Sequence, residues 1–159
     1  MRDEPSQQIA PRALTVWRIY GALNSLFLVI LTIVSFVIAF LTPIPLWISF
    51  VILLIAIIII YLLVYLLPKI RYRVWRYEVR EFEIELKYGL FIIRKVLIPM
   101  VRVQHVDTKQ GPILRHFDLS SVTISTAATV HEIPALDNET ADQVRDYISK
   151  MARVTEEDV

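Results

Sequence analysis

The 159-residue chain contains no cysteine, three glycines and almost no net charge. Without cysteine it has neither disulfide bonds nor thiolate metal sites, which is typical of a protein whose folded domain faces a reducing compartment. The scarcity of glycine disfavours a glycine-rich phosphate-binding loop. A formal net charge of +1 disfavours nucleic acid as a partner, because a protein that neutralises phosphates needs a strongly basic face.

Charged side chains are also missing from one long stretch, between Arg18 and Lys69. Its apolar sequence is interrupted at residues 42–45, which leaves two segments at about 21–41 and 46–67. A helix of this length rises about 31 Å, close to the ~30 Å hydrocarbon core of a bilayer, and satisfies its own backbone polar groups there. We therefore predict a multi-pass protein of the cell membrane, with the lipid bilayer as a partner and a transmembrane helical hairpin over residues 16–67.

The positions of the cations predict the orientation of this hairpin. Arg12 and Arg18 flank its first segment, a cluster of cations follows its second, and the turn between them carries no charge. The positive-inside rule then places both the N- and C-termini in the cytoplasm. The cations after the second segment set this topology, and they are also candidates for contact with anionic lipid head groups, at about 1 kcal/mol each. They are Lys69, Arg71, Arg73 and Arg76.

Small residues recur along the first apolar segment at spacings that permit close helix packing. Glycine and serine four residues apart let two helices approach closely, either within the hairpin or against another membrane subunit. Since the span holds no ionisable side chain, a transporter or a proton path is disfavoured. The candidate helix-packing residues are Gly21, Ser25, Thr32 and Ser35.

After the hairpin the periodicity of the sequence changes. Apolar residues at 82, 84, 86 and 88 alternate with charged ones, which predicts a strand with one buried and one exposed face. The spacing of Ala141, Val144, Ile148 and Met151 predicts an amphipathic C-terminal helix. Strands are further expected at 72–79, with a bulge near Trp75, and at 91–98, 101–108, 121–126 and 130–133, with breaks at Pro99 and 109–112.

Four short segments occur in order within this region: residues 98–106 (IPMVRVQHV), 110–117 (QGPILRHF), 122–126 (VTIST) and 133–134 (IP). Together they resemble the bacterial pleckstrin-homology-like (PH-like) membrane proteins, from residue 68 to about 151, and the two preceding spans match the small two-span members. The family commonly has glycine where Asp118 stands, and often near Ala127 and Ala128, so the turns there differ in detail.

The resemblance implies an α+β fold with membrane helices. In it, an N-terminal transmembrane helical hairpin precedes a PH-like domain of two nearly orthogonal antiparallel β-sheets, capped by a C-terminal α-helix. The expected organisation is a disordered cytoplasmic tail at 1–15, the hairpin at 16–67, the PH-like domain at 68–152 and a C-terminal tail at 153–159.

Residues that often carry chemistry have plainer interpretations here. His105, His116 and His131 lack the spacing of a zinc site. Glutamates at 81, 83 and 85 fit the exposed face of the strand better than acid–base catalysis. We therefore expect no catalytic residue, no cofactor and no metal, and a protein that is not an enzyme.

Two functions remain open. The first is a non-catalytic interaction or scaffold module at the cytoplasmic face of the membrane, in a homo-oligomer or with a related membrane protein. The second is a sensor whose PH-like domain binds a lipid head group or an envelope-stress ligand. Because a fold does not dictate an activity, the resemblance does not choose between them.

Overall fold

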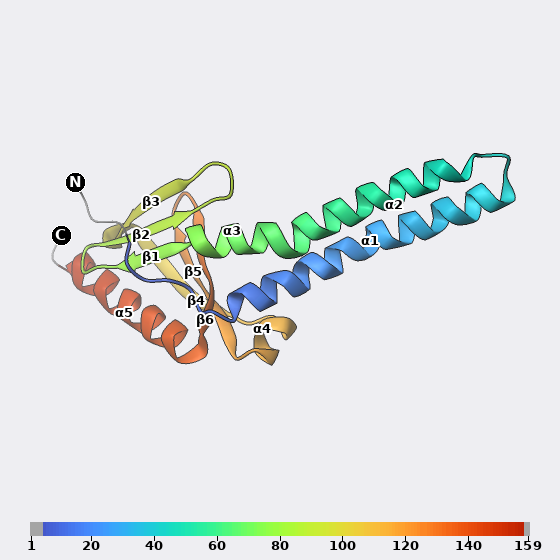
Figure 1. The fold of residues 1–159 in the computed structure, drawn as a ribbon. Helices are drawn as coiled ribbons and strands as arrows, with labels where there is room; N and C mark the ends of the chain where they lie inside the picture. Colours follow the sequence, from blue (N-terminus) through green and yellow to red (C-terminus); the bar gives the residue numbers. More distant parts are fainter. Residues whose placement is uncertain (1–4, 158–159) are drawn as a thin grey trace. The chain divides into compact units, whose positions relative to one another are not determined.

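The computed structural model describes residues 5–157, with side chains up to Val154, and divides into two compact units (Figure 1). The helical unit comprises Trp17–Ile70. The globular unit comprises the chain up to Val16 and again from Arg71 onward. The segment before the first apolar helix is therefore part of the globular unit.

The helical unit is built from two antiparallel helices (Figure 1). Helix α1 spans Ala13–Leu41, and the second helix runs as α2 (Leu46–Tyr61), a π-helical turn η1 (Leu62–Leu66) and α3 (Leu67–Val74). Both helices are long and apolar enough to cross a membrane. The two predicted spans are thus confirmed as helices, although α1 begins earlier and α3 ends later than the apolar segments.

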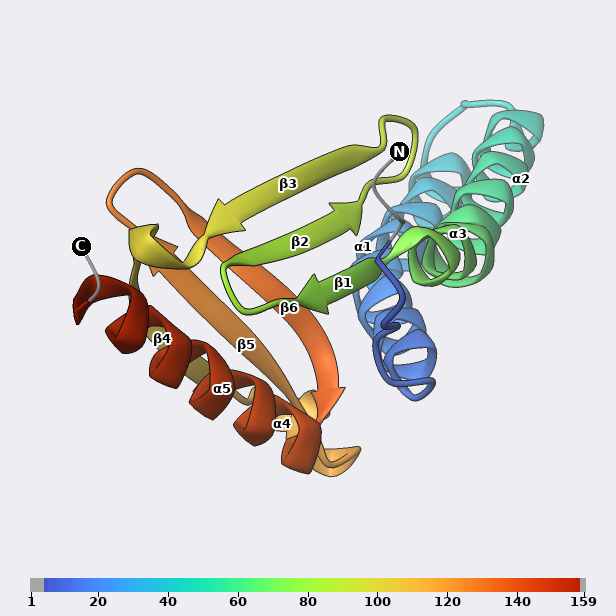
Figure 2. The ribbon, with the colours of Figure 1, turned by 90° about the vertical axis from the view of Figure 1, so that its left-hand side faces the viewer.

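The globular unit contains two three-stranded antiparallel sheets. In the first sheet the order is β1 (Arg76–Val79), β2 (Glu83–Tyr88) and β3 (Arg94–Pro99). In the second it is β4 (Val103–Lys109), β5 (Leu119–Thr126) and β6 (Val130–Asp137). Strands of the first sheet cross those of the second (Figure 2).

Three helices complete this unit. The 3-10 turn η2 (Met100–Arg102) joins the sheets, α4 (Pro112–His116) lies between β4 and β5, and the long α5 (Asn138–Glu157) packs against η2, β4 and β5. The core consists of apolar side chains from both sheets, η2 and the inner face of α5. They include Ile84, Leu86, Met100, Leu119, Val122, Ile124, Ile133, Leu136, Ala141 and Ile148. The predicted fold class, with its PH-like domain and C-terminal helix, is confirmed.

The N-terminal segment differs most from its prediction. Gln7 exchanges two backbone hydrogen bonds with Tyr77 of β1 (3.1 and 2.9 Å), and the Ala10 N–H donates to the carbonyl oxygen of Ala135 in β6 (3.2 Å). The side chain of Ile9 is 1% exposed. The segment, blue in Figure 2, therefore links the edges of the two sheets. The expectation of a disordered tail over 1–15 is wrong for residues 5–15, and residues 1–4 lie outside the described chain.

Several element boundaries also differ. Residues 72–74 are helical and β1 begins at Arg76, so the change of apolar parity near Trp75 marks a helix–strand junction and not a bulge. Residues 91–93 form a loop before β3. Strand β6 continues beyond the expected end at residue 133 to Asp137. Its pairing with β5 has a register shift between Ser120 and Val122, which interrupts the alternation of side chains along β6. At the C-terminus α5 extends to Glu157, so most of the expected tail is helical.

Candidate functional site

The four cations predicted to contact lipid do not form one patch. Lys69 and Arg73 are four residues apart on α3 and share a face, whereas Arg71 projects about half a turn away. Arg76 lies in β1, where its guanidinium donates to the carbonyl oxygen of Trp75 (2.9 Å). The structure thus divides the cluster between two elements.

Arg71 is placed beside a carboxylate of its own domain. It lines a small cleft of about 220 Å³ together with Trp75, Tyr88 and Glu132. The Glu132 carboxylate attracts the Arg71 guanidinium. A lipid phosphate would compete with this carboxylate, so Lys69 and Arg73 are the stronger candidates for head-group contact among the helical cations.

The small residues of α1 are used inside the hairpin. A side chain added at Gly21 would meet the carbonyl oxygen of Leu63 in η1 at 2.5 Å, so glycine permits the close approach of the two helices. Ser25 and Thr32 are buried, and their hydroxyls donate to carbonyl oxygens one turn earlier on α1 (both 2.8 Å).

Ser35 is joined to the second helix by hydrogen bonds. Its hydroxyl lies 3.0 Å from that of Ser49 on α2, and the Ser49 hydroxyl also lies 3.1 Å from the Ser35 carbonyl oxygen. Ser49 is 1% exposed. Gly21 and Ser35 therefore contact the second helix, whereas Ser25 and Thr32 are buried with their hydroxyls bonded within α1.

A larger cleft lies in the globular unit, between the end of β3 and the turn joining β5 to β6. It has a volume of about 420 Å³. Leu97 and Val101 supply apolar walls, while Arg102 and His131 supply polar groups. The Nε2 atom of His131 is hydrogen-bonded to the Thr129 hydroxyl (2.8 Å). Sequence reasoning missed this cleft, although two of the family-like segments, 98–106 and 122–126, contribute to its walls.

The two outer edges of the first sheet differ in whether another segment of the chain is bonded to them. The N-terminal segment covers the outer edge of β1 through Gln7, whereas no strand within residues 5–157 pairs with the outer edge of β3. Leu97, in β3, is 44% exposed and Val101, in η2, is 54% exposed. An open backbone edge with apolar side chains beside a cleft is suited to binding an extended segment.

Each of the three histidines has its own contact partner. His105 is 2.8 Å from the Asp107 carboxylate, and the His116 ring packs edge-on against Phe117. Over the residues described, no group of three or more His, Cys, Asp or Glu side chains is arranged to hold a metal ion.

The predicted exposed row of glutamates is partly wrong, because Glu85 is only 8% exposed. Its carboxylate lies 3.9 Å from the guanidinium of Arg80, which also meets Glu78 (3.2 Å) and Glu83 (3.6 Å). The hydrogen bond to Glu78 and the nearby carboxylates raise the pKa of Arg80. This ion-pair cluster binds the carboxylates to a permanent cation, which suits a structural role.

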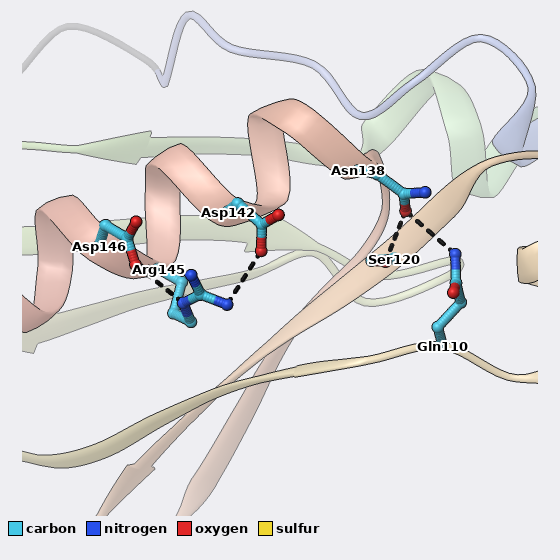
Figure 3. A network of polar contacts seen from close by, with 6 residues as sticks. All are labelled: Gln110, Ser120, Asn138, Asp142, Arg145 and Asp146. Carbon is cyan, nitrogen blue, oxygen red and sulfur yellow. Dashed lines mark hydrogen bonds and ion pairs between the residues drawn. The ribbon is translucent and has the colours of Figure 1, made fainter.

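A second polar network fastens α5 to the second sheet (Figure 3). The side-chain oxygen of Asn138 accepts hydrogen bonds from the Ser120 hydroxyl (2.6 Å) and the Gln110 amide (3.1 Å). About two turns further along α5, Arg145 bridges Asp142 and Asp146. The contacts of Asn138 link the start of β5, the residue after β4 and the start of α5.

Two apolar helices followed by two crossed antiparallel sheets and a capping helix define a membrane protein with a PH-like domain. The chain belongs to the bacterial PH domain family, which matches residues 19–152. It is 47% identical to the UPF0699 transmembrane protein YdbS of Bacillus subtilis (strain 168), over all 159 residues and the full length of both chains. No solved structure matches the chain. The predicted family is thereby confirmed, as is the assignment to the membrane.

Proposed function

We propose that the chain is a non-catalytic interaction module, held at the cytoplasmic face of the cell membrane by its hairpin, whose PH-like domain binds a protein partner. The partner is a second copy of the chain or a related membrane protein. The observation that carries this proposal is the open edge of β3 beside the cleft of about 420 Å³.

The physical basis is strand addition. An extended partner segment pairs its backbone with the exposed edge of β3, and the adjoining cleft accepts one of its side chains, which gives specificity. Leu97 and Val101 supply the apolar contacts. Because the domain follows the hairpin without a long linker, partners in the same membrane meet it at a high effective concentration.

Site-specific photo-crosslinking in native membranes tests this surface. A photoreactive phenylalanine analogue at Leu97 is expected to give a covalent adduct larger than the 18.5 kDa chain. The matched control is the same analogue at Tyr147 on α5, which is 41% exposed. No adduct at Leu97, or equal adducts at both positions, would contradict the proposal. The mass of the adduct distinguishes a second copy from a different protein.

A sensor is the second candidate function, and the polar side of the same cleft favours it. Arg102 and His131 can meet an anionic group there, since one is a permanent cation and the other is a hydrogen-bonding ring. Glycerol phosphate is a suitable probe of head-group binding. A saturable shift of the His131 resonances, lost in Arg102→Gln, together with the absence of a Leu97 adduct, would favour the sensor over the scaffold.

A further inference from the structure

The loop that joins β2 to β3 exposes three successive apolar side chains. Phe91, Ile92 and Ile93 are 92%, 75% and 54% exposed. Such a run on a domain surface is a liability unless it has a binding role. Gly89, with φ of 139°, folds the loop so closely that a side chain there would collide with the Ile92 carbonyl. The apolar tip is thus held in a defined turn.

Cations stand in a row at the base of this loop. In the register of the first sheet Arg76 lies opposite Lys87, and Lys87 lies opposite Lys95. Opposite residues share a face of the sheet, where like charges destabilise their pairing. Lys95 is exposed and Arg76 and Lys87 are half-buried; Arg94, which is exposed, directly follows the apolar tip. The row therefore brings three cations together on one face of the sheet, beside the apolar tip.

The opposite end of the same sheet has the opposite charge. The turn between β1 and β2 lies within the acidic cluster around Arg80, which includes Glu78 and Glu83. Phe82, in that turn, is 68% exposed. The sheet is therefore basic and apolar at one end and acidic at the other, which favours contact of the basic end with a negatively charged membrane.

The base of the loop also contacts the residue that follows α3. Tyr88, the residue before Gly89, stacks on Trp75 with ring centroids 5.8 Å apart. Trp75 directly follows α3, whose eight residues from Leu67 extend about 12 Å. The residue at the base of the loop therefore contacts the residue that directly follows α3.

We infer that residues 90–93 insert into the interface of the membrane leaflet beside which the second helix ends, and that Arg76, Lys87 and Lys95 contact its anionic head groups. An apolar tip flanked by cations is the usual composition of a segment that lies in the interface. The loop gives the domain a second membrane contact, in addition to the hairpin, and orients its sheet on the bilayer. This inference depends on membrane anchoring and not on the proposed protein partner.

Depth-dependent quenching in the full-length protein tests this contact. Because the chain has no cysteine, a single cysteine at Ile92 can carry an environment-sensitive fluorophore in nanodiscs of phosphatidylglycerol and phosphatidylcholine. We expect a blue-shifted emission that is quenched by lipids spin-labelled near the head group. The matched control is a cysteine at Phe82, which is expected to remain unquenched. Lys87→Gln with Lys95→Gln should remove the difference between anionic and purely phosphatidylcholine nanodiscs.

Three results would overturn the inference. They are an unquenched probe at Ile92, equal quenching at Ile92 and Phe82, and a blue shift at Ile92 without quenching by the lipid labels. The last result would show that protein, such as a second copy of the chain, covers the loop. Each is independent of crosslinking at Leu97, so failure of this inference and failure of the proposed partner surface are separable.

Discussion

Two residues other than glycine, Asp118 and Ala135, hold the left-handed backbone conformation, with φ of 55° and 50°. Asp118 is exposed at the turn between α4 and β5, where the family resemblance implies glycine. A side chain in this conformation costs roughly 1–2 kcal/mol, less for aspartate, and the extra freedom of glycine in the unfolded chain offsets part of the gain.

We therefore expect Asp118→Gly to raise the free energy of unfolding by about 0.5 kcal/mol and Asp118→Val to lower it by about 1 kcal/mol. Denaturant unfolding of the detergent-solubilised protein measures both. Asp142→Gly, in the interior of α5, is the control and should destabilise by about 1 kcal/mol. A destabilising Asp118→Gly would show that the aspartate side chain matters more than the backbone conformation.

Tyr77 makes the stability of the folded domain depend on pH. Its side chain is 3% exposed, and burial, followed by the Asp137 carboxylate, raises the pKa of its phenol above the ordinary value of 10.0. The folded protein thus holds this proton more tightly than the unfolded chain, so the associated stability is complete below pH 10 and is lost as the pH rises through the folded pKa. The thermal unfolding temperature of the wild-type protein should fall steeply above pH ~10. Tyr77→Phe should reduce that fall. Identical pH profiles of the unfolding temperature in the two proteins would refute the role of Tyr77.

At the scale of elements, the N-terminal segment is bonded to both sheets through an isolated bridge to β1 and a hydrogen bond to β6. Ile9 is buried, and the segment is hydrogen-bonded to both β1 and β6, so removing the Ile9 side chain leaves a cavity beside the sheets. We expect Ile9→Ala to lower the free energy of unfolding by about 2–4 kcal/mol, a large share of the stability of a domain this small. Ser6→Ala, at an exposed position of the same segment, should change it by less than about 0.5 kcal/mol. Equal effects of the two substitutions would mean that the segment does not pack on the sheets in solution.

The elements that the sequence predicts well are those with strong local signals. The uncharged stretch between Arg18 and Lys69 and the spacing of apolar residues in α5 need no knowledge of the fold. The N-terminal segment could not be predicted in this way, because its hydrogen-bonding partners, Tyr77 and Ala135, are distant in sequence. Residues 91–93 were expected in a strand because they are apolar and β-branched or aromatic, yet Gly89 turns them into a loop.

The candidate surfaces were less predictable than the fold, for the same physical reason. The cleft beside Leu97 combines residues from β3, η2 and the β5–β6 turn, which only the folded sheets bring together. The row of Arg76, Lys87 and Lys95 depends on the register of three strands, which composition does not determine. The sequence identified Arg76 as a membrane-proximal cation, but its lysine neighbours required the structure.

For the whole molecule, the pairing of Gln7 with Tyr77 bears on membrane topology. A hydrogen-bonded contact between a segment before the first helix and a strand after the second requires both to lie on one side of the bilayer, which two crossings satisfy. By the positive-inside rule, the flanking cations predict that this side is the cytoplasm. We therefore predict that the turn at residues 42–45 faces the other side.

Cysteine labelling in intact cells measures this arrangement directly, since the wild-type chain offers no competing thiol. A membrane-impermeant maleimide should label Ile44→Cys in intact cells, but should label Ser6→Cys and Lys150→Cys only after the membrane is opened. Labelling of Lys150→Cys from outside would invert the predicted topology. Labelling of Ser6→Cys from outside while Lys150→Cys stays protected would break the pairing of Gln7 with Tyr77, because a segment outside the cell cannot bond to a strand inside it. The two positions therefore test the orientation of the hairpin and the contact between segment and sheet as separate claims.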